Sequence, residues 1–484
     1  MGRLPLILLL FFPSALWAQD SLRVSALDAE ASEPGTASLF LSPQRLGGGW
    51  STIPSDGVSH ALWTGQGQAG LTAAAETWSL DVRWEVIRSE GSFHRRAMQA
   101  GYDRTWADGS GASRFRARWD WQPLPSLHVA LGRDTAHAGW GRRSLFRGRH
   151  VGPTPFAEIH LDGGGRLRYR HRIDALRGQR HLSCWTGATG DPRTWLPPSG
   201  PLRAGIERMV VSHRLEVDFG QRLTGALWGA VVWNIEDGQR AFEPHYLLPL
   251  TSLRPTEYAQ GSSDNALVGV EGRLRLGQGG ANRPRTLYGQ FLLDELIVSE
   301  LLGGTQWWGN KFGLLGGMDW HTHWGGWRLE ATAVRPWTFS HFTSTAAYLH
   351  GLTPLAHPLG ANFVEAAAEG HWKADEWTLS ARLTASVRGD DPTGDTPTGS
   401  LPQVGDIDRT ADQYAWLNGA LRHRRVAFLD IARTLTLTDG VQVDAFLQSA
   451  VGLEWTEGVN AFDRTEFWLG LGLRSTGPFF GADW

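Results

Sequence analysis

Three residues in the second half of the sequence are of types that a metal ion accepts. Asp319, His321 and His323 alternate along the chain, so on an extended strand they share one face. Successive residues on one face of a strand stand about 7 Å apart, and three ligands from one straight strand therefore cannot converge on one ion unaided. We expect no metal and no other cofactor.

A second group has the residue types of a hydrolase. Ser340 and His341 are adjacent, and His357 and Asn362 follow, so a Ser-His-Asn set is present. Adjacent residues on a strand point to opposite faces, so Ser340 and His341 cannot be a nucleophile and its base unless the segment is irregular. We expect this block to be structural and the protein not to be an enzyme.

Arginine supplies almost all of the positive charge, because Lys311 and Lys373 are the only lysines among 46 basic residues. Arginine pairs bidentately with carboxylates, so a row in which it occupies every second position could meet acidic sugars. Such a row runs from Arg166 to Arg172. The alternative, which we favour, is that these arginines pair with glutamates inside the fold. The formal net charge of −3 argues against a nucleic-acid partner.

The elements that must position these residues are β-strands. Apolar and polar residues alternate with period two in 78–86, 115–121, 268–276, 377–387, 441–447 and 467–473. Several of these segments have the length of a tilted strand that crosses a bilayer, and their polar faces are rich in Arg and Glu. Tryptophans stand repeatedly at strand ends, as interfacial girdles require. The pattern predicts an all-β, transmembrane antiparallel β-barrel, with a soluble sandwich or propeller as the alternative.

The chain divides into three parts. Residues 1–18 are typical of a signal peptide, with Arg3, an apolar run and a small residue at Ala18. Residues 19–75 lack sustained alternation and are interpreted as an N-terminal periplasmic or plug segment. Residues 76–484 are interpreted as the barrel. Outside the leader no apolar run approaches the roughly 20 residues of a membrane helix. The single cysteine, Cys184, cannot form an intrachain disulfide.

Ten motifs carry a resemblance to a known family. They are Leu131–Asp134, Gly139–Phe146, Pro153–Phe156, Ser212–Glu216, Tyr246 with Pro249, Asp264–Gly269, Tyr288–Glu295, Trp307–Gly313, Arg335–His341 and Leu355–Phe363. In these segments the chain resembles the capsule-assembly Wzi family of outer-membrane proteins, well over about 130–370 and loosely outside it. Arg142 departs from the proline often found after the tryptophan-glycine signature.

The resemblance implies a monomeric barrel of about 18 strands in the cell outer membrane, plugged from the periplasmic side. It would act as a lectin that attaches capsular or extracellular polysaccharide to the surface, with outer-membrane lipid as its other partner. A diffusion channel (porin) is the first alternative and an outer-membrane hydrolase the second. The residues expected to bind polysaccharide or to form a network in the lumen are Arg133, Asp134, Trp140, Asn265, Asp294, Glu295, Asn310, Lys311, Arg335, His341, His357 and Asn362.

The glycan is expected at the outer loops. Trp185–Gly205 and Gly389–Tyr414 are long and polar and contain Trp, Tyr, Arg and Asp, which offer ring faces and charged groups to sugars. The part Gly389–Asp406 is interpreted as a surface loop that can be deleted without loss of barrel assembly.

Overall fold

A computed structural model gives the fold of residues 36–475. It describes this range except for 54–57, 90–103, 106–110, 178–205, 236–243, 249–263, 278–284, 324, 343, 352, 392–395, 438–441 and 458–462. The predicted signal peptide 1–18, Cys184 and the predicted outer loop Trp185–Gly205 lie outside the described residues.

The regular secondary structure of the described residues is almost entirely β, which confirms the predicted fold class. The strands are β1 (Thr36–Ile53), β2 (Val58–Ala74), β3 (Trp78–Ser89), β4 (Arg104–Thr105), β5 (Gly111–Leu124), β6 (Leu127–Asp134), β7 (Thr154–Asp162), β8 (Leu167–Arg177), β9 (Ile206–Phe219), β10 (Leu223–Asn234), β11 (Asn265–Leu276), β12 (Arg285–Glu295), β13 (Lys311–His321), β14 (Gly325–Val334), β15 (Leu349–His350), β16 (Thr353–Pro354), β17 (Phe363–Ala374), β18 (Trp377–Asp390), β19 (Ala420–Thr436), β20 (Gln442–Thr456) and β21 (Asp463–Ser475). Short helical turns are α3 (Pro244–Leu247), α5 (Val298–Gly303), η3 (Ser344–Ala346) and η4 (Asp406–Asp408).

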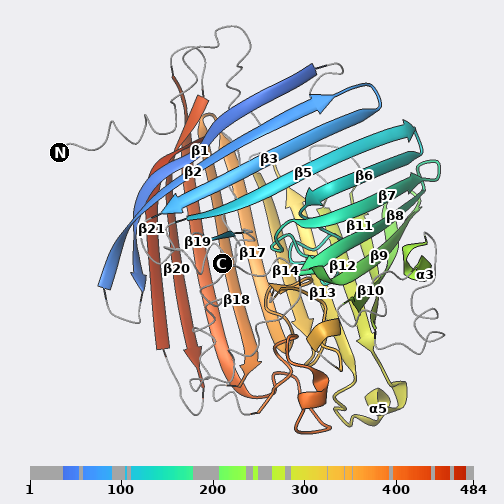
Figure 1. The fold of residues 1–484 in the computed structure, drawn as a ribbon. Helices are drawn as coiled ribbons and strands as arrows, with labels where there is room; N and C mark the ends of the chain where they lie inside the picture. The colour runs from blue at the N-terminus through green and yellow to red at the C-terminus, as the bar shows by residue number, and fades with distance from the viewer. Residues whose placement is uncertain are drawn as a thin grey trace.

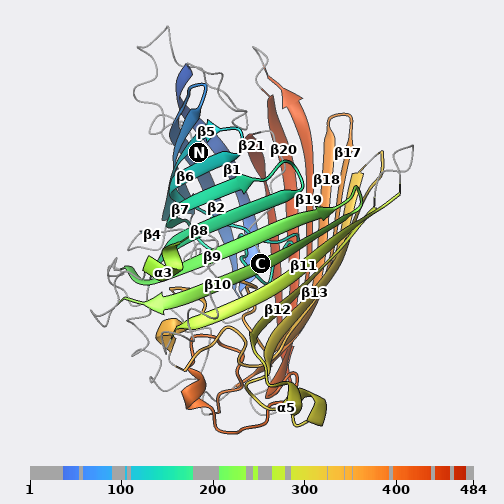
Figure 2. The ribbon, with the colours of Figure 1, turned by 90° about the vertical axis from the view of Figure 1, so that its right-hand side faces the viewer.

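The strands close into a ring, as Figures 1 and 2 show. One sheet contains 19 strands of the described chain, and without the two-residue β4 the ring has 18. Each strand pairs antiparallel with the next strand of the ring, and β21 pairs with β1, from Arg45 opposite Arg474 to Thr52 opposite Phe467. The ring is therefore a closed barrel without free edges.

The two ends of the barrel differ. At one end the connections are tight, such as those from β2 to β3, from β7 to β8 and from β17 to β18. The N-terminal end of β1 and the C-terminal end of β21 also lie at this end. At the other end the connections are long and carry α5 and η4, which lie at the bottom of Figure 1. We call these the short-turn end and the long-loop end. In outer-membrane barrels short turns face the periplasm and long loops face outward.

The wall has apolar residues outside and charged residues inside. On β18 the side chain of Leu383 is 60% exposed, whereas its neighbour Arg382 is 7% exposed and faces the lumen. Trp78, Trp121 and Trp377 form an exposed aromatic girdle at the short-turn end. Along the strands, ten residues of the outer face separate the register row of Trp377 from that of Trp455. At a strand tilt of about 40° this distance corresponds to a height of about 25 Å along the barrel axis. This polarity and height are those of a barrel whose outer wall faces lipid.

No helix in the described part of the chain is long and apolar enough to cross a membrane.

The prediction that residues 19–75 form a plug is wrong over most of their described length. The first described strand of the barrel begins at Thr36 rather than at residue 76. Residues 36–53 and 58–74 are β1 and β2, and β1 closes the ring. The lumen is instead filled by two segments that enter from the long-loop end. We call 135–153, between β6 and β7, the lumen loop, and 335–362, between β14 and β17, the signature loop. Their apolar side chains form the main core inside the ring with inward residues of the wall; the core includes Phe146, Trp228, Leu292, Phe339, Tyr348 and Phe363.

Candidate functional site

The lumen loop is held by carboxylates that project inward from the barrel wall. Glu330 accepts hydrogen bonds from the backbone N–H groups of Arg142, at 2.8 Å, and Arg143, at 3.2 Å. Glu271 accepts one from the backbone N–H of Trp140 at 3.1 Å. Both glutamates are buried, so these charge-assisted bonds lie in a low-dielectric interior, where they are strong. These hydrogen bonds from the wall therefore fix the position of the lumen-loop backbone.

A buried glutamate also joins the lumen loop to the signature loop. Glu365, on β17, pairs with the guanidinium of Arg143, and each side chain is 5% exposed. The second oxygen of Glu365 lies 3.2 Å from Nε2 of His357, which is fully buried and stacks on Phe363 at 4.4 Å between ring centroids. Nearby, Arg142 pairs with Glu369 at 2.5 Å. We call Glu271, Glu330, Glu365 and Glu369 with their partners the lumen latch.

The ring of Trp140 lies near two arginines of the wall. The guanidinium carbons of Arg214 and Arg273 are 5.2 Å and 4.8 Å from its centroid. Arg214 also pairs with Glu271, which holds the backbone of Trp140. Trp140, predicted as a sugar contact or lumen residue, is thus a lumen residue surrounded by the wall.

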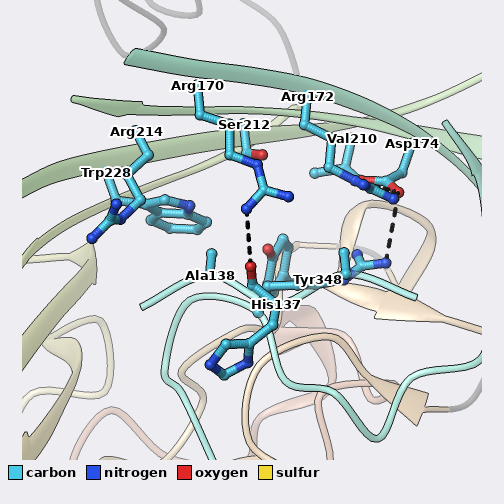
Figure 3. A pocket seen from close by; sticks show the side chains of 12 residues that line it. His137, Ala138, Arg170, Arg172, Asp174, Val210, Ser212, Arg214, Trp228 and Tyr348 are labelled. Atoms are coloured by element: carbon cyan, nitrogen blue, oxygen red, sulfur yellow. Dashed lines mark hydrogen bonds and ion pairs between the residues drawn. The ribbon is translucent and has the colours of Figure 1, made fainter. Parts of the chain in front are cut away.

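Only a small cavity separates the lumen loop from β8–β10 (Figure 3). Its volume is about 20 Å³, which is room for about one water molecule. Arg170 donates to the carbonyl of His137 at 3.2 Å across one side, and Arg147 lies 3.9 Å from Asp174 on the other. The geometry suits a sealed polar contact between loop and wall better than a site for a solute.

The arginine row of β8 pairs with carboxylates, as the favoured interpretation expected. Arg168 pairs with Glu216, Arg170 lies 2.5 Å from Glu158, and Arg172 lies 2.8 Å from Asp174. Arg166 lies just before β8 in an exposed turn.

Five of the predicted site residues meet at the long-loop end. Lys311, which is 1% exposed, lies 2.6 Å from Asp406 and 3.2 Å from Glu295. The carboxylate of Asp294 accepts from the backbone N–H of Phe339 at 2.8 Å. The guanidinium of Arg335 donates to the carbonyl of Asn310 at 2.8 Å and to that of Tyr414 at 3.0 Å. We call Asp294, Glu295, Asn310, Lys311, Arg335 and Asp406 the mouth cluster.

Aromatic rings border the mouth cluster. Trp308 lies near two cations, with Nζ of Lys311 4.9 Å and the guanidinium of Arg409 4.1 Å from its centroid. Trp307 contacts Trp308 at 5.4 Å, and both are only partly buried. Rings beside charged groups at a partly open surface are what sugar recognition uses. Burial lowers the pKa of the Arg335 guanidinium, which its three carbonyl partners nevertheless hold in place.

Asn362 fixes the end of the signature loop. It has a left-handed backbone with φ of 57°. Its buried side-chain amide donates to the carbonyls of Gly389 and Asn418, at 3.0 and 2.8 Å, and to the hydroxyl of Ser400 at 3.1 Å. The interpretation of Gly389–Asp406 as a dispensable surface loop is therefore wrong for its described residues. Gly389 belongs to β18, while Ser400 and Asp406 are buried partners of Asn362 and Lys311.

The remaining predicted residues have the following places. Arg133 donates to two carbonyls, those of Phe115 and Pro153, at the end of β6. Asp134 accepts from the backbone N–H of Thr135 and lies 3.8 Å from Arg116. Asn265 is buried at the start of β11. The carbonyl of His341 accepts from the backbone N–H of Asp406 at 3.0 Å.

The two chemical candidates of the sequence have local partners. Asp319 accepts two hydrogen bonds from Arg328 on the next strand, at 2.6 and 2.8 Å. The hydroxyl of Ser340 donates to the carbonyl of Trp337 in its own turn. In this conformation the Ser340 hydroxyl donates its hydrogen bond to a backbone carbonyl and not to a histidine.

Sequence reasoning missed the carboxylates of the lumen latch. Glu271 lies in a segment whose alternation was recognised, so its inward direction could have been predicted. Its partner in the lumen loop could not, because Trp140 and Glu271 are 131 residues apart and nothing local indicates that the loop enters the barrel.

Two partly buried histidines, one in each loop, predict an acid-sensitive fold. Burial, together with the positive charge of Arg149, lowers the pKa of His137 to about 4, and burial with the charge of Arg177 lowers that of His350 to about 3. In the unfolded chain both pKa values are about 6.5, so the unfolded state binds more protons below that pH. We expect the unfolding midpoint in detergent to be constant above about pH 6.5 and to fall towards pH 4. The variant His137→Gln should show a smaller fall, and an equal fall would contradict a role for His137.

Comparisons with known proteins support the fold. No protein-family profile matches the sequence, and no curated protein matches it. Among solved structures, Acinetobacter baumannii OccAB2 matches with a TM-score of 0.51 at 7% identity, over 92% of this chain and 98% of that one. Wzi of Escherichia coli, described as a carbohydrate-binding outer-membrane β-barrel, gives 0.49 at 14% identity over 89% and 84%. A BenF-like porin of Pseudomonas fluorescens gives 0.49 at 10% over 91% and 99%.

Proposed function

We propose that this chain is a lectin-like protein of the cell outer membrane that binds capsular or extracellular polysaccharide at its long-loop end and holds it at the surface. A closed barrel with a lipid-facing wall and short turns at one end supports this placement, because barrels in that membrane have their long loops outside. The ordered motifs of the sequence agree with the same role.

One observation favours binding over diffusion. The lumen latch ties the lumen loop to three wall strands, β11, β14 and β17, through charged side chains, and the signature loop packs against it. A diffusion channel needs an open lumen, whereas here two loops occupy it and are fixed by interactions that cost several kcal/mol to break. A rigid filled lumen supports a static surface at the long-loop end.

We assign the polymer to the partly exposed surface beside the mouth cluster, whose own side chains are mostly buried. Trp307 and Trp308 offer ring area for sugar faces, while Arg409 and the partly exposed Glu295 offer groups for hydroxyls or carboxylates. Each sugar contact replaces water and is weak. A repeating polymer that meets many copies of the protein gains avidity through effective concentration.

Two measurements on detergent-purified protein test the proposal. A glycan array should give binding to surface polysaccharides, and Trp308→Ala should weaken it by roughly three- to tenfold, the value of about one stacking contact. Trp377→Ala, in the girdle at the opposite end, is the matched control and should leave binding unchanged. A planar bilayer should show little conductance. Stable conductance without glycan binding would favour the channel and overturn the proposal.

A further inference from the structure

The outer wall carries a groove lined by small side chains. Gly316, Ala331, Ala366 and Ala385 stand opposite one another on four neighbouring strands, β13, β14, β17 and β18. All four are exposed on the lipid-facing side. Larger outward residues border them, among them Leu329 and Leu383. The groove has a volume of about 860 Å³ and an almost wholly apolar lining, which is the size range of small-molecule and cofactor sites.

A cation ends this row of small residues. Arg425, on β19, is the next residue in register after Ala385, lines the groove and is exposed. Its guanidinium lies 5.0 Å from the ring centroid of Trp455, and within the described chain it has neither a hydrogen bond nor an ion pair. An arginine on the lipid face of a barrel is destabilising, and more so the deeper it lies. Its position therefore calls for an anion from outside the chain.

The depth of Arg425 matches a lipid headgroup. It lies two residues from His423, which is in the row of Trp455, so it is about 5 Å below that row. The acids of this rim are Glu457, bonded to His423 at 2.7 Å, and Asp463, opposite Trp455. Both stand on the β20–β21 side of Arg425, whereas the groove extends on the β18 side.

The same strand offers an internal comparison. Arg433, also exposed and 5.6 Å from the ring centroid of Trp377, lies at the short-turn end of β19. It has a carboxylate partner within the chain, because Glu376 lies 3.0 Å away. Arg425 has the same arrangement of guanidinium and tryptophan, but no acid of the described chain pairs with it.

We propose that the groove and Arg425 bind one anionic lipid of the leaflet at the long-loop end. The guanidinium pairs with the phosphate, as its planar donors suit, and an acyl chain fills the space above the small residues. The proposal rests on the membrane placement and does not depend on polysaccharide binding. It makes this part of the wall a selective lipid site rather than a general lipid contact.

Native mass spectrometry of the full chain, released from nanodiscs of phosphatidylcholine with a minor share of phosphatidylglycerol, tests this site. The expected result is one retained phosphatidylglycerol per chain. Arg425→Gln should reduce its retention about tenfold, the value of one charge-assisted interaction. Arg433→Gln, the matched control, should leave retention unchanged. The double variant Ala366→Leu, Ala385→Leu should reduce retention of either lipid at this site by filling the groove.

Three outcomes would overturn the lipid site. The first is equal retention of phosphatidylcholine and phosphatidylglycerol, and the second is an equal loss of phosphatidylglycerol retention in Arg425→Gln and Arg433→Gln. The third is displacement of the bound lipid by free glycerol 3-phosphate, which would mean that the chain holds no acyl group. Gel migration of unheated samples verifies that each variant forms a closed barrel. Glycan binding by Arg425→Gln should equal that of the unaltered chain, so this test fails or succeeds independently of the polysaccharide proposal.

Discussion

Replacing Glu365 with glutamine should lower the free energy of unfolding by about 3–5 kcal/mol and make the barrel conductive. Glu365 is the buried anion that joins Arg143 of the lumen loop to His357 of the signature loop. Glutamine keeps the shape of the side chain but removes its charge, which leaves the Arg143 guanidinium buried opposite a neutral group. Losing one partner of a buried pair costs far more than the pair contributes net, because the remaining charge stays desolvated.

Unfolding in detergent and current through a planar bilayer measure the two effects. Glu376→Gln is the matched control, since Glu376 forms an exposed ion pair with Arg433 and should be worth at most about 1 kcal/mol. If Glu365→Gln behaved like this control, the lumen latch would not hold the loops. If it lost stability without gaining conductance, the apolar core between the two loops would suffice to keep the lumen closed.

The wall of the barrel could be predicted from the sequence because its cause is local. Residues such as Leu383 and Arg382 must face opposite sides of a strand, so alternation reports both the strand and its two environments. β1 and β2 escaped this reasoning. Their segments contain Gly47, Gly48 and Gly49 and show little alternation, and β1 is a barrel strand because it pairs with β21 at the far end of the chain.

The site was predictable only as a set of positions. The motifs identified Lys311, Arg335 and Asn362, and the structure assigns all three to buried contacts that hold loops together. Their roles depend on Asp406, Tyr414 and Gly389, which are remote in the sequence and meet them only in the folded barrel. A motif shows that a residue type matters at a position, whereas its partner follows from tertiary packing.

The close fit of the lumen loop against the wall gives a second large effect. Gly269 on β11 faces inward, and a Cβ atom placed there would lie 2.2 Å from Cε1 of Phe146. Phe146 cannot easily give way, because it is fully buried, stacks on Trp228 at 4.9 Å, and its carbonyl accepts a hydrogen bond from Tyr348 at 2.9 Å. Gly269→Ala is therefore expected to destabilise the barrel by about 1–3 kcal/mol, as overpacking of a core does.

The displaced ring should also loosen the lumen loop, so Gly269→Ala should raise conductance while Trp307 and Trp308 continue to bind glycan. Gly272→Ala on the same strand is the matched control. No atom lies within 4 Å of a Cβ at Gly272, and alanine there should be neutral or stabilising by a few tenths of a kcal/mol, since glycine weakens a strand. Equal unfolding midpoints for the two variants would show that Phe146 does not pack against β11. A loss of glycan binding in Gly269→Ala alone would place the polymer in the lumen rather than at the mouth, because only the lumen loop would have moved.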